Sequence, residues 1–137
     1  MPTVRPATAA DIDAVLDLWE RGAGESHFKN DAEGVQRLLD RDPESLLIAE
    51  DGGRIVGTVI AGFDGWRAHV YRMAVDPDCR KRNVGRALVH SMEERFRALG
   101  AKRSDAIVYL SNDLGRSFWS ALGYSPDTTV DRWTKLL

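Results

Sequence analysis

Residues 75–89, VDPDCRKRNVGRALV, join the end of a predicted strand to the start of a predicted helix through a basic loop. The positive charges of this stretch are carried by Arg80, Lys81, Arg82 and Arg86. A helix start offers unpaired backbone N–H groups and the positive end of the helix dipole, and both favour an anion. Gly85, one residue inside the helix, lets a ligand approach the backbone where a side chain would block it. The stretch therefore predicts a pyrophosphate site; the alternative interpretation is a solvated basic turn.

The chain before this loop has the pattern of an antiparallel meander. Residues 45–49 and 55–61 are apolar strand candidates on either side of an Asp-Gly-Gly turn signal at 51–53. A second turn signal, Asp-Gly at 64–65, leads into a third strand over 68–75. The third strand ends where the basic loop begins, so the meander delivers the chain to the predicted anion site.

Two helices are predicted near the N-terminus. Thr8 and Asp11 have the spacing of a capping box, which indicates that the first helix begins there. Apolar residues then recur at helical spacing, namely Ile12, Val15, Leu16, Leu18 and Trp19. The helical pattern ends at the Gly-Ala-Gly of 22–24. Residues 3–5, which precede this helix, form a short strand candidate. A weaker apolar face predicts the second helix over 31–40.

After the loop, the spacing predicts a long helix over 83–99, a buried strand over 106–110, a short helix over 115–122 and a last strand over 130–137. A chain of 137 residues is the size of one ordinary domain, so we predict a single domain over 1–137. The order of elements indicates an α+β (mixed α/β) fold.

The composition excludes several classes of protein. Hydrophobic residues make up 43% and charged residues 29%, as in a globular chain, and a net charge of −2 argues against a nucleic-acid partner. No apolar run reaches the roughly 18 residues of a membrane span, and no signal peptide is visible, so no membrane partner and a cytoplasmic location are expected. Cys79 is the single cysteine, which excludes an intramolecular disulfide and a Cys-rich zinc site. No metal is predicted.

The basic loop resembles motif A of the GCN5-related N-acetyltransferase (GNAT) family, whose pattern is Gln or Arg, two residues, Gly, any residue, then Gly or Ala. Here the six positions read Arg80, Lys81, Arg82, Asn83, Val84 and Gly85, so that asparagine replaces the central glycine. Asparagine tolerates left-handed geometry better than most residues, and we expect the loop to survive. Residues 112–124, NDLGRSFWSALGY, are similar to motif B of this family, and residues 5–19 are similar to its opening strand and first helix.

The resemblance implies a GNAT-like fold, with a central, mostly antiparallel twisted sheet flanked by helices, and acetyl-CoA as co-substrate. It implies that the strand before the loop splays from its neighbour, and that the backbone of Met73, Ala74 and Val75 pairs with the pantetheine arm. It implies that residues 80–86 hold the pyrophosphate. Asn112, Phe118 and Trp119 are expected to flank the thioester end.

The resemblance further implies an N-acetyltransferase that transfers acetyl groups directly to a primary amine in a ternary complex. His69 occupies the strand position at which the family often carries a glutamate base, and a histidine can accept a proton at neutral pH. A surface or packing histidine is the alternative. Trp119 replaces the family's usual tyrosine acid, and an indole cannot supply a proton, so the acid stays open.

The acceptor amine is left open between small molecules and protein N-termini or lysines. The acids of the predicted acceptor region are compatible with a cationic amine; they are Glu20, Glu25, Asp31, Glu33 and Asp64. A homodimer is also left open. The alternative function is a non-catalytic coenzyme A-binding sensor or scaffold module.

Overall fold

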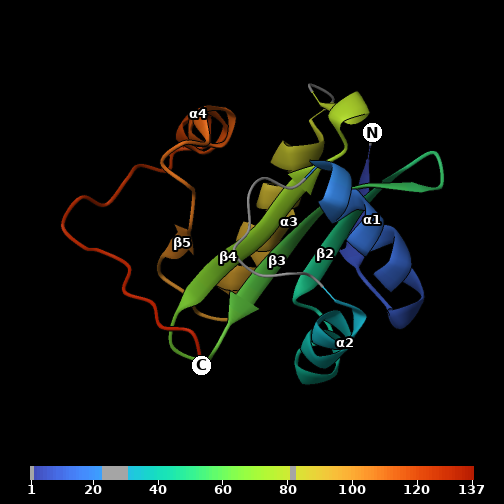
Figure 1. The fold of residues 1–137 in the computed structure, drawn as a ribbon, viewed down its shortest axis with the longest axis horizontal. Helices are drawn as coiled ribbons and strands as arrows, with labels where there is room; N and C mark the ends of the chain where they lie inside the picture. Colours follow the sequence, from blue (N-terminus) through green and yellow to red (C-terminus); the bar gives the residue numbers. More distant parts are fainter. Residues whose placement is uncertain (1, 23–30, 81–82) are drawn as a thin grey trace. The chain divides into compact units, whose positions relative to one another are not determined.

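The computed structural model describes residues 2–22, 31–80 and 83–137. The chain divides into two compact units, one ending at Ile107 and the other covering Val108–Leu137. The first unit contains a sheet of strand order β1-β2-β3-β4-β5, formed by β1 (Thr3–Pro6), β2 (Leu46–Asp51), β3 (Arg54–Phe63), β4 (Ala68–Val75) and β5 (Ser104–Ala106) (Figure 1). Neighbours from β1 to β4 pair antiparallel, and β4 pairs with β5 in parallel. The predicted fold class, α+β with a mostly antiparallel sheet, is confirmed.

The β2–β3 hairpin shows why this part of the fold could be predicted. Asp51 pairs with Arg54, which leaves a two-residue loop. Its residues, Gly52 and Gly53, have φ of 62° and 78°. Two consecutive positive φ angles define the turn whose twist matches that of the flanking strands, and glycine adopts them without strain. The predicted turn at 51–53 is confirmed.

Helices cover both faces of this sheet (Figure 1). A short 3-10 turn, η1 (Ala9–Asp11), leads into α1 (Ile12–Gly22), and α2 (Ala32–Arg41) follows. They share one apolar core with the sheet, formed by Ala7, Ile12, Val15, Trp19, Val35, Leu39, Leu46, Ile48 and Ala74. The opposite face carries α3 (Val84–Ala98), whose Val84 and Leu88 side chains reach Gly57 of β3. A Cβ on Gly57 would come within 2.7 Å of Val84, so the absence of a side chain lets α3 approach the sheet closely.

The second unit contains α4 (Asp113–Ala121) as its regular element. The strand predicted over 106–110 is wrong in its bounds, because β5 ends at Ala106, where its pairing with β4 also ends. The strand predicted over 130–137 is also wrong: no strand is assigned there, and Trp133 is 91% exposed. A strand needs a ladder of backbone partners, and residues 130–137 have no strand pairing within the described part of the chain. The single domain predicted over 1–137 stays a prediction.

No helix among residues 2–22, 31–80 and 83–137 combines the length and the apolar character that crossing a membrane requires.

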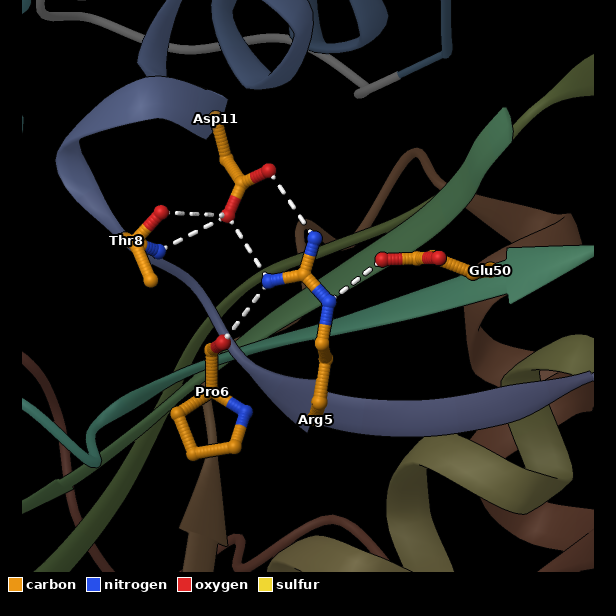
Figure 2. Close-up of polar contacts among 5 residues, drawn as sticks. All are labelled: Arg5, Pro6, Thr8, Asp11 and Glu50. Atoms are coloured by element: carbon orange, nitrogen blue, oxygen red, sulfur yellow. Dashed lines mark hydrogen bonds and ion pairs between the residues drawn. The ribbon is translucent and has the colours of Figure 1, made fainter. Parts of the chain in front are cut away.

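A network of charges fixes the N-terminal strand to the start of α1 (Figure 2). The guanidinium of Arg5 donates to both carboxylate oxygens of Asp11, at 2.8 and 3.0 Å, and also to Glu50 of β2. Asp11 accepts in addition from the backbone N–H of Thr8 at 2.8 Å, as the predicted capping box requires. The hydrogen bonds from Arg5 and Thr8 lower the pKa of Asp11 from 3.8 to about 2, against the opposing effect of burial.

Asp11→Asn is expected to lower the free energy of unfolding at neutral pH by about 1–2 kcal/mol, through loss of the ion pair and of part of the cap. The pKa of Asp11 is lower in the folded protein, so its stabilisation is present above the ordinary pKa of 3.8 and is lost as the pH falls towards 2. Urea unfolding of both proteins at several pH values measures this difference. An equal stability gap at neutral pH and at pH 2 would contradict it.

Candidate active site

The predicted anion loop begins where β4 ends. A 3-10 turn, η2 (Pro77–Cys79), follows the strand, and Arg80 closes it in an extended conformation. Asn83 then adopts left-handed geometry, with φ of 63° and ψ of 16°, directly before α3. Asparagine thus occupies the conformation that glycine adopts most readily, and its predicted tolerance of that geometry is confirmed. Lys81 and Arg82 lie outside the described residues.

The first turn of α3 presents backbone donors. The carbonyl of Asn83 accepts the first helical hydrogen bond, from the N–H of Ala87 at 3.0 Å. The side chain of Asn83 makes no capping hydrogen bond within the described chain, so it does not occupy the N–H groups of the first turn. Val84 and Gly85 are buried, whereas Arg80 and Arg86, which flank them in the sequence, are exposed. The first-turn N–H groups, the helix dipole and two described cations therefore belong to one short stretch of chain.

Asp76 anchors the start of this loop, directly before η2. Its side chain is 1% exposed and accepts from Arg21 of α1 at 3.2 Å and from Arg54 of β3 at 3.1 Å. Its other carboxylate oxygen accepts from the backbone N–H of Asp78 at 2.9 Å. The Asp78 bond is the main cause of the lowered pKa of Asp76, and Arg21 and Arg54 lower it further. This buried carboxylate joins α1, β3 and the loop.

Strands β4 and β5 separate before the loop. β4 pairs with β5 only from Ala68, opposite Ser104, to Val70, opposite Ala106. The rest of β4, residues 71–75, has no β5 partner in the described chain and keeps β3 as its neighbour on the other side. The predicted Met73–Val75 segment therefore lies on a sheet edge that β5 does not cover.

A bulge interrupts β4 within residues 71–75. Thr58 pairs with Ala74 and Ile60 with Tyr71, so two residues of β4, at positions 72 and 73, oppose one residue of β3. Arg72 has φ of 53°, the left-handed region that glycine usually occupies at such a bulge. The extra residue inverts the alternation of side chains from this point to the end of the strand.

His69 lies on the face of the sheet that α1 covers. It pairs with Gly62, which is on the same face of β3 as Thr58, and Thr58 is hydrogen-bonded to α1. The imidazole is half-buried, and its ring centroid is 6.2 Å from that of Tyr71. The backbone N–H groups of Arg67 and Trp66 lower the pKa of the Asp64 carboxyl, and the nearby His69 lowers the pKa of Asp64 further.

Three predicted site residues belong to the second unit. Asn112 caps α4, since its side chain accepts from the N–H of Gly115 at 2.9 Å. Trp119 is buried, and its ring meets those of Phe118 and Tyr124 edge to face, with centroids 5.2 and 4.8 Å apart. Within this unit, Asn112 and Trp119 thus have clear structural roles. Their predicted place beside the thioester stays a prediction.

A cavity of about 310 Å³ lies at the opposite end of β4 from the loop, between the β3–β4 turn and the start of β5. Trp66, Arg67, Lys102 and Arg103 are among the residues that line it. Since the loop follows the last residue of β4 and the cavity borders the first, this cavity is separate from the predicted coenzyme site. Among the described residues, no group of three or more His, Cys, Asp or Glu side chains is placed to hold a metal ion.

The chain is similar to known acetyltransferases over most of its length. The family model described as "Acetyltransferase (GNAT) family" matches residues 12–124. An acetyltransferase of Pectobacterium atrosepticum is 35% identical over 121 residues, which cover 88% of this chain and 84% of that protein.

Solved structures share the fold. Ard1 from Thermoplasma volcanium matches with a TM-score of 0.80 at 22% identity, over 90% of this chain and 82% of its own. An aminoglycoside acetyltransferase from an uncultured soil metagenomic sample, in complex with sisomicin, matches with a TM-score of 0.79 at 17% identity, over 99% and 96% of the two chains. The two solved structures show that the fold is shared, whereas the family model and the Pectobacterium relative show the family membership. The protein is an acyltransferase and belongs to the GCN5-related N-acetyltransferase (GNAT) family.

Proposed function

We propose that this enzyme transfers the acetyl group of acetyl-CoA to a primary amine by direct transfer in a ternary complex. The observation that carries the proposal is the loop after β4, where left-handed Asn83 precedes a helix start and makes no side-chain capping bond within the described residues. Arg80 and Arg86, on either side of Asn83 in the sequence, are exposed. A diphosphate matches this arrangement, because it can accept from several N–H groups while two guanidinium groups neutralise its charge.

The edge of β4 that β5 does not cover supports the pantetheine part of the proposal. The N–H of Asp76 donates to the carbonyl of Val56 in β3 at 2.8 Å. In an antiparallel ladder the inward and outward backbone groups alternate, so those of Val75 and Met73 are directed away from β3. An extended pantetheine arm contains two amides and can pair with such groups as an added strand would. Met73, Ala74 and Val75 are therefore proposed as coenzyme-binding residues, together with residues 80–86.

His69 is the proposed base. The acceptor amine is protonated in neutral water and must lose a proton before its nitrogen lone pair can attack the thioester carbonyl. His69 takes this proton, directly or through one water molecule, and the nitrogen then forms a bond to the carbonyl carbon. The half-buried position of His69 on the face covered by α1 is compatible with contact to both solvent and a bound amine.

Collapse of the tetrahedral adduct breaks the carbon–sulfur bond and releases coenzyme A as a thiolate. The nitrogen loses its second proton at this stage, and the sulfur gains one, so that an amide, a thiol and one released proton are the products. Solvent is the proposed proton donor to sulfur, because an indole at position 119 cannot donate a proton at neutral pH. Asn112, Phe118 and Trp119 are proposed to flank the thioester.

The acceptor is proposed to be a cationic amine, either of a small molecule or of a protein. Acidic side chains lie in exposed positions near the proposed acceptor face, at Glu20 of α1, at Asp31, which caps α2, and at Glu33 of α2. Asp64, in the β3–β4 turn, is held by the backbone N–H groups of Trp66 and Arg67 at 2.7 and 2.8 Å. Carboxylates in these places attract an ammonium group. Glu25 lies outside the described residues.

Incubation with acetyl-CoA and a panel of amines tests the proposed function. The panel contains polyamines, aminoglycosides and peptides with free N-termini or lysines, and thiol release is measured for each. Amine-dependent release of free thiol, with the acetylated amine identified by mass spectrometry, is the expected result. Binding of acetyl-CoA without thiol release on any amine would favour a non-catalytic coenzyme A-binding module instead.

We also propose a cytoplasmic location, where acetyl-CoA would be available to the enzyme. The oligomeric state, including a homodimer, is to be measured by light scattering.

A further inference from the structure

A buried chain of hydrogen bonds connects α1 to the bulge of β4. Trp19 Nε1 donates to Thr58 Oγ1 at 2.7 Å, and Thr58 Oγ1 contacts the carbonyl oxygen of Arg72 at 3.0 Å. Trp19 is 5% exposed and Thr58 is fully buried. The guanidinium carbon of Arg72 lies 5.4 Å from the centroid of the Trp19 ring. The two buried polar side chains thus form one chain of hydrogen bonds that ends at the carbonyl of Arg72. The proposed reaction gives neither side chain a role.

The direction of this chain follows from the chemistry of its members. An indole N–H can only donate, so the Thr58 oxygen must accept from Trp19. A hydroxyl has one proton, and a backbone carbonyl can only accept, so that proton goes to the carbonyl of Arg72. Both contacts of the Thr58 hydroxyl can therefore be hydrogen bonds in only one orientation of its proton, the one directed at the Arg72 carbonyl. A buried donor left without a partner would be destabilising by about 1–3 kcal/mol, which keeps this arrangement in place.

The carbonyl of Arg72 also fixes the N–H of Met73. The two groups belong to one planar trans peptide unit, in which C=O and N–H point in opposite directions. Because the carbonyl points towards Thr58 of β3, the N–H of Met73 points away from β3. That direction leads to the edge of β4 at which pairing with β5 has already ended.

The conformation of Arg72 requires such support. A residue with a side chain in the left-handed region is destabilised by about 1 kcal/mol or more, and it persists only where its surroundings fix it. At Arg72 the surroundings include the hydrogen bond from Thr58 to its carbonyl and the placement of its guanidinium over the Trp19 ring. The bulge is therefore held by α1 and β3 together.

We propose that Thr58 and Trp19 are positioning residues that aim the Met73 N–H at the acetyl thioester. The inference rests on the proposed function, because it needs acetyl-CoA on the edge of β4 that β5 does not cover. A fixed backbone donor aimed at the carbonyl oxygen stabilises the negative charge that develops there during attack. The Thr58 hydroxyl and the Trp19 indole thus act on the reaction through the peptide plane between Arg72 and Met73, without contact to the substrate.

Hydrogen exchange of the Met73 amide, followed by NMR with and without acetyl-CoA, tests the inference without knowledge of the acceptor. In the wild-type protein, acetyl-CoA is expected to slow this exchange about tenfold or more, since the amide gains a partner. In Thr58→Val, which keeps the shape of threonine but lacks the hydroxyl, the slowing is expected to fall below about twofold. Calorimetry is expected to give similar acetyl-CoA affinities for both proteins, because the pyrophosphate loop is unchanged.

Two further variants separate positioning from stability. Thr58→Ser keeps the hydroxyl and is expected to retain the wild-type protection of Met73. The double variant Trp19→Phe with Thr58→Val removes both polar partners, so no buried donor is left unpaired, and it is expected to be more stable than Thr58→Val alone. The double variant should still lack the protection, and it provides the test if Thr58→Val does not fold.

Full protection of Met73 in a folded variant without the Thr58 hydroxyl overturns the inference and leaves the proposed function intact. Absence of acetyl-CoA binding to the wild-type protein overturns both. Loss of protection in Thr58→Val together with its return in Thr58→Ser supports the inference. A purely structural role would lower the melting temperature of Thr58→Val and leave the Met73 protection unchanged.

Discussion

Replacing Gly85 by leucine is expected to abolish measurable acetyl-CoA binding while the fold persists. Gly85 lies in the first turn of α3, directly after left-handed Asn83 and Val84, where backbone N–H groups are proposed to bind the pyrophosphate. A leucine side chain added to this turn would keep a diphosphate from hydrogen-bond distance of those groups. Isothermal calorimetry measures the affinity, and circular dichroism with thermal melting checks the fold.

Two matched variants control this experiment. Gly85→Ala is expected to bind acetyl-CoA, because the family pattern accepts alanine at this position. Ala98→Leu adds the same side chain at the exposed far end of α3, about 20 Å along the helix axis, and is expected to bind as the wild type does. Because Gly85 is buried, Arg86→Glu provides a second test on an exposed residue and is expected to weaken binding about tenfold. Unchanged affinity in both Gly85→Leu and Arg86→Glu would remove the coenzyme from this loop.

The part of the fold that could be predicted from the sequence is the part governed by local rules. The β2–β3 hairpin has its glycines where positive φ is needed, and α3 combines an apolar stripe with a glycine stop. The capping box at Thr8 and Asp11 likewise placed the start of the first helical segment to within a residue. Such signals lie within a few residues of the structure that they determine.

The features that could not be predicted depend on residues far apart in the sequence. No local signal marks Arg72 as left-handed, because that geometry depends on Thr58 and Trp19, which lie in β3 and α1. Asp76 precedes a proline and has the character of an ordinary turn residue, yet Arg21 and Arg54 make it a buried carboxylate. A bulge and a buried ion pair are tertiary features, and pattern rules do not contain them.

The candidate site likewise contains features that could be predicted from the sequence and features that could not. Asn83 was predictable, because a family pattern and a backbone preference agreed on one position, and its φ of 63° confirms the preference. The strand over 130–137 was predicted from the local sequence pattern alone, and a local pattern cannot form a strand without a partner. The backbone edge at Met73–Val75 lies between these cases, since the family resemblance located it but the bulge that orients it came from the structure.

His69→Ala is expected to lower kcat by about 10²-fold or more, with little change in acetyl-CoA affinity, if His69 is the base. The motivation is its strand position opposite Gly62, on the face covered by α1, and its distance along β4 from the coenzyme loop. His90 is exposed on α3, so His90→Ala is a matched control that should retain full activity. The comparison needs an acceptor amine identified by thiol release.

The pH dependence distinguishes a base from a packing residue. Imidazole changes protonation near neutral pH, so the wild-type kcat/KM is expected to rise through about pH 6 to 7 and then level off. His69→Ala should lose that rise and recover part of its activity at high pH, where the amine deprotonates in solution without a base. A packing histidine would instead give a small loss of equal size at every pH, because the lost contacts do not titrate. A variant profile that keeps the wild-type shape would therefore remove His69 from the mechanism and leave solvent as the proton acceptor.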